Sequence, residues 1–283
     1  ITRSGLVQSV HAFAGDNVSL ALFLALIVLS VVAGIVGLAL RWKSFGSDLA
    51  EDDQIESMLS RDIAYYLNNL VLIVLACLLA YMTIAQALPS WMPFGGQSIS
   101  AGTYNAIARP IGVAYLAILA VCPLLGWGKT DGKAFLKAAR VPAALALVSF
   151  IVFMVYWAID LLPAYNAGVA AGGSIAEGFT VYGPAAYYHG LAIVGFAVAS
   201  LLFFNALFMI GRGVGKFAKV KGINQVQAFF SFARNVSGQF GGALAHAGMA
   251  VCLVGLIGSS MYVSEVAGYV DYDEKTDTAA VFQ

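Results

Sequence analysis

The sequence predicts an all-α, polytopic transmembrane helix bundle with about six spans. Of its 283 residues, 60% are hydrophobic and only 11% are charged, and the mean hydropathy of +0.84 is far above that of ordinary soluble domains. The apolar residues form runs that can cross a hydrocarbon core of about 30 Å, which takes roughly 20 helical residues. Such runs differ from the short alternating segments of a membrane β-barrel, so helices are expected.

The apolar stretches divide the chain into three parts. Residues 17–263 form the predicted membrane bundle, after an external segment at 1–16 and before an external tail at 264–283. Acidic residues and apolar residues at helical spacing near 47–64 predict an interfacial helix on the cytoplasmic face. The spans themselves are expected at about 17–41, 65–88, 109–127, 141–163, 184–211 and 241–263.

The segments between the spans are expected to be loops of different kinds. Segments 89–108 and 164–183 are nearly uncharged and rich in small residues, so they are expected to pack against another part of the protein or to cover a site. Segment 212–240 combines lysines with the sequence FFSF and suits the membrane surface, although a plain basic loop explains it as well.

The positive charges predict the orientation of the bundle. Twelve of the fifteen Lys and Arg residues fall on the segments after the first, third and fifth spans. Because such residues concentrate on cytoplasmic loops, both termini are expected to be extracytoplasmic, in a multi-pass protein of the plasma (inner) membrane. The formal net charge of zero gives no support to a nucleic-acid partner.

Three histidines are candidates for chemistry. His11 precedes the first span on the predicted outer side; His189 lies near the outer end of the fifth span, and His246 near the cytoplasmic end of the sixth. Small residues around His246 leave room for a flat macrocycle or a close neighbouring helix. His189 follows two tyrosines at an interface, where a structural role is expected.

The depths of His189 and His246 disfavour a shared metal. Each lies about 7 Å from its own face of a core about 30 Å thick, so they differ by about 15 Å in depth. Two imidazole nitrogens on one metal lie only about 4 Å apart. If His246 is a ligand, it therefore needs a partner other than His189.

Other chemistry finds little support in the sequence. No phosphate-binding glycine loop, no HExxH motif and no nucleophile with an assignable base is present, so no catalytic residue is assigned. Cys77, Cys122 and Cys252 lie in apolar runs without metal-site spacing and are expected to be packing residues.

Four stretches, in this order, resemble the C-terminal half of CcmF/NrfE-type proteins, the membrane haem lyase components of cytochrome c maturation. The resemblance covers nearly the whole chain. The Trp-rich external segment of that family and its remaining histidine ligands belong to the N-terminal half and have no counterpart here. The matching stretches are TRSGLVQSVHAFAGD (2–16), SRDIAYYLNNLVL (60–72), ISAGTYNAIARPIGVAYLAILAVCPLLGW (99–127) and LAHAGMAVCLVGLIGSS (244–260).

The resemblance implies a role and two site residues. The protein would take haem from a haem chaperone on the outer face and assist its covalent attachment to the CxxCH motif of apocytochrome c. His11 matches an external ligand of haem in transit, and His246 matches a ligand of a permanent intramembrane haem b; both would be axial iron ligands. Implied partners are an N-terminal half as a separate or missing segment, the haem chaperone, apocytochrome c and its thiol-handling subunits, besides membrane lipid.

Two other classes of function remain open on the sequence. A haem b-bearing membrane anchor of a respiratory quinol oxidoreductase would need a ligand pair inside the bundle. A transporter would need broken spans and a polar cluster near the midplane, for which Asn68 and Asn69 make a weak case. Whether the chain is itself an enzyme, such as a haem lyase acting with an N-terminal half, is left open by the residues.

Overall fold

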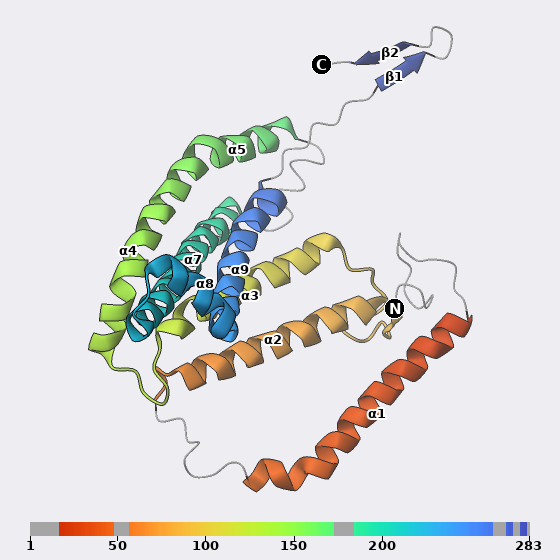
Figure 1. Cartoon of the computed structure of the whole chain (residues 1–283). Helices are drawn as coiled ribbons and strands as arrows, with labels where there is room; N and C mark the ends of the chain where they lie inside the picture. The colour runs from red at the N-terminus through yellow and green to blue at the C-terminus, as the bar shows by residue number, and fades with distance from the viewer. Residues whose placement is uncertain (1–16, 48–56, 173–183, 263–269, 274–277, 282–283) are drawn as a thin grey trace. The chain divides into compact units, whose positions relative to one another are not determined.

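The computed structural model describes residues 17–47, 57–172, 184–262, 270–273 and 278–281. Nearly all of these residues are helical, and six helices are long and apolar enough to cross a membrane. The predicted all-α fold and its six spans are therefore confirmed, with one small addition: an antiparallel hairpin that pairs Val270 with Val281. Its strands are β1 (Val270–Asp273) and β2 (Thr278–Val281) (Figure 1).

The helices and single helical turns follow one another along the chain. Their bounds are α1 Asn17–Ser47, α2 Arg61–Ile84, η2 Ala85–Ala87, α3 Ala101–Val121, η3 Cys122–Leu124, α4 Gly132–Tyr156, η4 Trp157–Leu161, α5 Leu162–Ala171, α7 Ala185–Lys221, α8 Gln225–Asn235 and α9 Ser237–Met261. The chain divides into two compact units, Ile1–Ala138 and Ala139–Gln283.

The first unit is organised around the pair α2 and α3. The N-terminus of α2 is tied to the segment that follows η3: Gly128 N–H donates to the Asp62 carboxylate at 2.7 Å, and the Arg61 guanidinium lies 5.1 Å from the Trp127 ring centroid. At the other end, the Tyr104 hydroxyl donates to Thr83 Oγ1 at 3.3 Å. These contacts fix both ends of the α2 and α3 pair.

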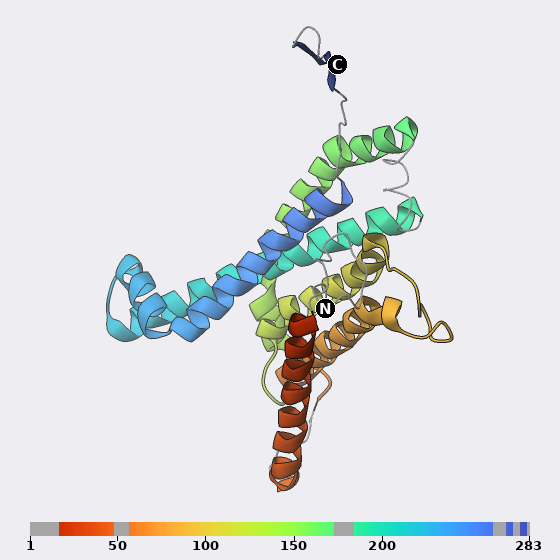
Figure 2. The same ribbon diagram turned by 90° about the vertical axis from the view of Figure 1, so that its right-hand side faces the viewer.

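The second unit is built on the antiparallel pair α7 and α9. The buried residues of α7 recur at spacings of three and four, with Ala192, Ala199 and Ala206 seven residues apart. On α9, Ala243 and Ala250 are likewise seven residues apart and are each 2% exposed. Such small side chains let two helix backbones approach closely. Figure 2 shows the two helices running side by side toward α8.

A short amphipathic helix, α8, joins α7 to α9. Gly222 ends α7 in the left-handed conformation, with φ 63°, and the Asn224 side chain accepts a hydrogen bond from Gln227 N–H at 2.8 Å, which caps α8. The buried side of α8 carries Ala228 and Phe232, which pack on the last turns of α7. We call the end of α7 from Arg212 together with α8 the elbow.

Three segments expected as loops contain helix in the structure, and one of them, 89–108, is helical from Ala101, where α3 begins. Segment 212–240, expected as a loop, is mostly helical because α7 continues to Lys221 and α8 follows. Segment 164–183 was also expected as a loop, but Leu162–Ala171 is helical; residues 173–183 lie outside the described part. Trp157–Leu161 forms a π-helix, and Pro163 lies two residues after its last residue. Because proline cannot pack against the carbonyl four residues earlier, the wider turn accommodates it.

The predicted interfacial helix near 47–64 stays a prediction. Residues 48–56 lie outside the described part of the chain, Ser57–Ser60 are not helical, and Arg61 already begins α2. Helix α2 begins here because the Ser60 hydroxyl accepts from Ile63 N–H at 3.3 Å and caps it. The span before it, α1, exposes every side chain that the structure describes.

A substitution at Gly213 tests the packing of the elbow. A Cβ atom at this position would overlap the ring of Phe232, which is only 4% exposed. We expect Gly213→Ala to cost about 1–3 kcal/mol of stability in this region, because overpacking forces side chains and backbone to shift. Hydrogen exchange of α8 amides, measured by mass spectrometry, should become faster.

The matched control is Gly215→Ala on the same helix, where a Cβ atom meets nothing within 4 Å. This control should leave α8 exchange unchanged. Equal protection of α8 in the two variants would contradict the packing of Phe232 against Gly213.

Candidate functional site

The buried alanines between α7 and α9 form what we call the alanine seam, and His246 lies at its edge; the seam consists of Ala192, Ala199, Ala206, Ala243 and Ala250. His246 follows Ala243 by three residues and precedes Ala250 by four, and both alanines are buried against α7. Since positions three and four residues apart share a helix face, the imidazole is held beside the seam and is itself partly exposed. The rigid helix pair therefore determines where this histidine stands.

The hydrogen bond of His246 determines which ring nitrogen is available. Nδ1 lies 2.6 Å from the Gly242 carbonyl oxygen, which can only accept, so Nδ1 carries the proton and donates. In the neutral imidazole the lone pair is then on Nε2. Metal-ligating histidines typically donate their other nitrogen to a carbonyl or carboxylate in this way. His246 thus presents Nε2 as the ring nitrogen that carries the lone pair.

Three of the glycines of α9 occupy a different side of the helix from His246, whereas Gly242, four residues earlier, shares its side. At about 100° per residue, Gly241, Gly248 and Gly255 lie roughly 140–180° around α9 from His246. A Cβ atom at any of these glycines would meet nothing within 4 Å among the described residues. The open space at Gly241, Gly248 and Gly255 therefore lies on a different side of α9 from the imidazole. A group bound to His246 would not lie over Gly248 or Gly255.

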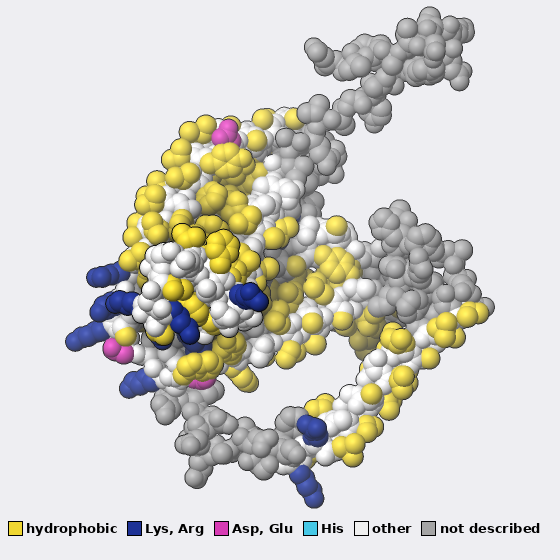
Figure 3. Space-filling view, in the orientation of Figure 1, with side chains coloured by type: hydrophobic (Ala, Val, Ile, Leu, Met, Phe, Trp, Pro, Cys, Tyr) yellow, Lys and Arg dark blue, Asp and Glu magenta, His cyan; other side chains and the backbone are white. Residues whose placement is uncertain are grey.

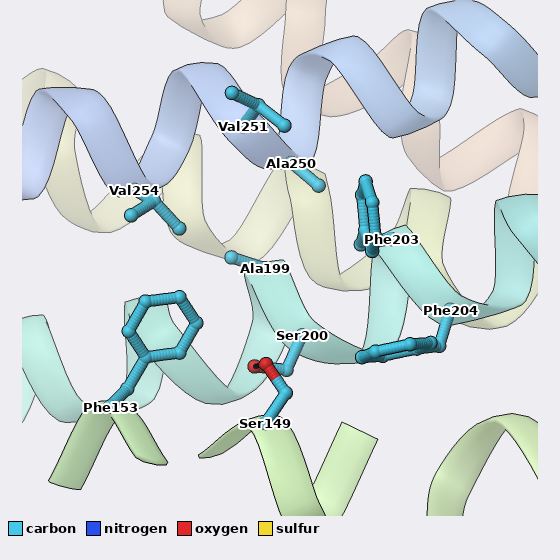
Figure 4. A pocket seen from close by; sticks show the side chains of 9 residues that line it. All are labelled: Ser149, Phe153, Ala199, Ser200, Phe203, Phe204, Ala250, Val251 and Val254. Carbon is cyan, nitrogen blue, oxygen red and sulfur yellow. Dashed lines mark hydrogen bonds between the residues drawn. The ribbon is translucent and has the colours of Figure 1, made fainter. Parts of the chain in front are cut away.

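An apolar pocket begins one helical turn from His246. It has a volume of about 230 Å³ and lies between α4, α7 and α9 (Figure 4). Its polar groups are two serines, with the Ser200 hydroxyl donating to Ser149 Oγ at 3.2 Å. The lining suits hydrocarbon. It is made by Ser149, Phe153, Ala199, Ser200, Phe203, Phe204, Ala250, Val251 and Val254.

His189 belongs to an aromatic cluster at the other end of the helix pair. The Trp157 indole N–H donates to the Tyr262 hydroxyl oxygen at 3.0 Å, and the same oxygen lies 2.9 Å from His189 Nδ1. The Tyr165 ring stands edge-on to the imidazole at 4.4 Å between centroids. We call Trp157, Tyr165, Tyr188, His189 and Tyr262 the aromatic clasp.

The aromatic clasp joins three helices. Tyr188 is 2% exposed, and its hydroxyl donates to the Met261 carbonyl at the end of α9. Trp157 comes from η4, and His189 from the first turns of α7. The contacts therefore hold the ends of α4, α7 and α9 together, and they give His189 hydrogen-bond and ring partners of the kind a structural histidine has.

His189 and His246 are too far apart to share a metal ion. Since His189 contacts Tyr262, its distance from His246 follows from the separation of sixteen positions between His246 and Tyr262. At 1.5 Å per residue these span about 24 Å. In the described part of the chain, no group of three or more His, Cys, Asp and Glu residues could hold a metal. His11, the other predicted ligand, lies outside the described residues.

Sequence reasoning did not identify Trp157 or Tyr262 as part of a site. Each is an aromatic residue at the end of an apolar run, a position that suits membrane-interface residues in general. Their pairing joins residues 105 positions apart, which no local pattern reveals. The signal that was present is the run of aromatics at 187–188 directly before His189.

The fold and these features define a multi-pass α-helical membrane protein with a histidine beside its central helix pair. Comparison with known proteins confirms the predicted resemblance: the chain is homologous to cytochrome c-type biogenesis proteins named CcmF and CycK along nearly its whole length. No family model matches the chain, and no solved structure matches it.

The relatives are distant and longer than this chain. It is 25% identical to CycK of Bradyrhizobium diazoefficiens over 98% of the chain, and 26% identical to CcmF of Pseudomonas aeruginosa over 94%. CycK of Rhizobium meliloti is 23% identical over 94% of the chain. The aligned regions make up 38%, 34% and 34% of these relatives, so the chain spans about a third of their length.

Replacing the Tyr262 hydroxyl tests the aromatic clasp. Tyr262→Phe leaves the Trp157 N–H without its acceptor, which should lower the free energy of unfolding by about 1–3 kcal/mol. Burial, the largest cause, raises the pKa of Tyr262 to about 12, with the Trp157 hydrogen bond opposing it. A raised pKa favours the protonated form, so the stability that burial of the neutral Tyr262 phenol contributes is full below pH 10 and is lost as the pH rises through about 12.

The measurement is denaturation of the purified protein in detergent, from pH 7 to 12. The alkaline loss of stability should be smaller in Tyr262→Phe than in the parent protein. Tyr187→Phe is the control, because Tyr187 is 44% exposed and should tolerate the change. Equal stability of the two variants at pH 7 would rule out the clasp as a stabilising contact.

Proposed function

We propose that this chain is a haem-handling membrane component of cytochrome c maturation. It would take haem from a haem chaperone on the outer face and assist its attachment to the CxxCH cysteines of apocytochrome c. The observation that carries the proposal is the similarity of nearly the whole chain to cytochrome c-type biogenesis proteins. Because the chain spans about a third of those proteins, the complete activity would need further parts.

His246 would be one axial ligand of an intramembrane haem b. The support is the geometry of the imidazole: Nδ1–H donates to the Gly242 carbonyl, so Nε2 carries the free lone pair. The seam residues Ala243 and Ala250 fix the helix that carries it, and the apolar pocket at Ala250 offers a dry surface nearby. Bound there, the haem would supply one-electron chemistry that keeps transferred iron reduced.

His11 would hold the haem that is being transferred. The residue precedes α1 in the external segment 1–16, and a neutral imidazole is a suitable iron ligand. Its role is proposed from the sequence alone, since it lies outside the described residues. The chain would then contribute mainly by holding haem and thiols in register, which is a proximity effect.

The charges of the second unit support an outer active face. In the α7 and α9 pair, all five cations from Arg212 to Arg234 lie at the elbow end, and α9 leads to the tail at the opposite end. With positive charge on the inner side, the tail after Tyr262 would be extracytoplasmic, in the plasma (inner) membrane. Partners at that face would be the haem chaperone and apocytochrome c with its thiol-handling subunits.

An N-terminal half would supply the second ligand of each haem. His246 has no histidine partner among the described residues, because the described His189 lies about 24 Å along α9 from it. The same separation weakens the alternative of a quinol oxidoreductase anchor, which predicts a ligand pair inside the bundle. A second segment that brings its own histidine to His246 would complete the site.

Replacement of His246 tests the intramembrane haem. We expect His246→Ala to lose most of the low-spin haem b spectrum and haem content of the assembled complex, because one axial ligand is missing. The Nδ1 hydrogen bond that is lost stays within one helix, so the fold should persist. Absorption spectra of the reduced complex and haem quantification provide the measurement.

The control is His189→Gln, which should keep the haem spectrum. Purification of the chain together with any N-terminal half is required, since the proposed site uses both. The haem proposal fails if the assembled parent complex has no low-spin haem b, or if His246→Ala leaves spectrum and haem content unchanged.

Replacement of His11 tests the transit site separately. His11→Ala should impair cytochrome c maturation by at least about tenfold while the intramembrane haem stays in place, because only the external ligand is lost. Added imidazole should restore part of the maturation, since it can fill the axial position. Covalent haem in a reporter cytochrome c is the measurement, and normal maturation in His11→Ala would refute the role.

A further inference from the structure

The elbow begins on a helix that is longer than the hydrocarbon core of a bilayer is thick. Helix α7 has 37 residues, which is about 55 Å at 1.5 Å per residue, whereas the core is about 30 Å thick. The excess length is at its C-terminal end, where Arg212 is the first of several exposed cations. Because α8 connects α7 directly to α9 and both are candidate spans, α8 is confined to the boundary between membrane and water.

The elbow carries several Lys and Arg residues, and the stretch of sequence around it contains no Asp or Glu. No Asp or Glu occurs in the sequence from 178 to 264, so the net charge of this whole stretch is positive. The cations are all exposed, and four of them fall within the last ten residues of α7. They are Arg212, Lys216, Lys219, Lys221 and Arg234.

The exposed side of α8 is apolar. Val226 and Phe230, one turn apart, are each 68% exposed, whereas Phe232 on the opposite side is 4% exposed and packs on α7. Val220, next to the lysines of α7, is 73% exposed. Figure 3 shows Lys and Arg side chains gathered over α7 and α8 beside hydrophobic ones.

We propose that the elbow is a docking surface for anionic phospholipid headgroups, with Val226 and Phe230 inserted among the first acyl carbons. Cations attract the anionic lipid surface, and an amphipathic helix with bulky apolar side chains lies in the plane of the interface. A water-soluble acidic partner would explain the cations but would leave Val226 and Phe230 in water. The proposal stands independently of any haem chemistry.

Lipid binding by the purified, delipidated full chain tests the charged half of the surface. Native mass spectrometry should show phosphatidylglycerol bound in preference to phosphatidylcholine. In the triple variant Lys216→Gln, Lys219→Gln, Lys221→Gln, we expect this preference to fall by about tenfold or more, because three cations near the headgroups are removed.

The matched control removes the same number of exposed charges elsewhere: Lys129→Gln, Lys133→Gln, Lys137→Gln. It should retain the preference for phosphatidylglycerol. The proposal is overturned if the α7 variant keeps the preference, or if both variants lose it equally, since the effect would then be one of net charge.

A depth measurement tests the apolar half in the reconstituted full chain. After replacement of Cys77, Cys122 and Cys252, nitroxide labels are placed at Phe230→Cys and, as control on the same helix, at the exposed Gln227→Cys. Collision with dissolved oxygen should exceed collision with a water-soluble nickel complex at 230, and the reverse should hold at 227. Equal water accessibility at both positions would overturn the insertion of α8.

Discussion

The alanine seam between α7 and α9 is the contact on which the second unit depends. Alanines at 192, 199 and 206 on α7, and at 243 and 250 on α9, recur every seven residues and bury one face of each helix. In a membrane the water-driven hydrophobic effect does not hold helices together, so close van der Waals packing of small side chains has to do so. The seam sets the rotation of α9 and thereby the side on which His246 stands.

The two ends of the α7 and α9 pair carry different groups of side chains, and the length of the helices keeps these groups apart. At one end, the aromatic clasp closes α4, α7 and α9 around His189 and Tyr262. At the other end, the elbow presents cations and the exposed Phe230. His246 lies between them, closer to the elbow. His189, which contacts aromatic rings, and His246, whose Nε2 carries the lone pair, thus occur on the same helix pair in different surroundings.

Much of the fold was predictable because lipid imposes simple rules. Long apolar runs must be helices, since the backbone has to satisfy its own hydrogen bonds, and all six expected spans are present. Segment boundaries were less predictable. The continuation of α7 to Lys221 and the helix α8 were expected as loop, because basic residues near a span suggested its end, whereas helical hydrogen bonds continue beyond the lipid until Gly222.

The sequence by itself determined the membrane class of this protein, its six spans, the candidate histidines and the resemblance to cytochrome c maturation proteins. These follow from composition, run length and local motifs. Only the tertiary structure decided that His246 stands beside alanines buried against α7, and that Tyr262 bonds to both Trp157 and His189. The physical reason is that these properties depend on helix phase and on contacts between residues far apart in the chain.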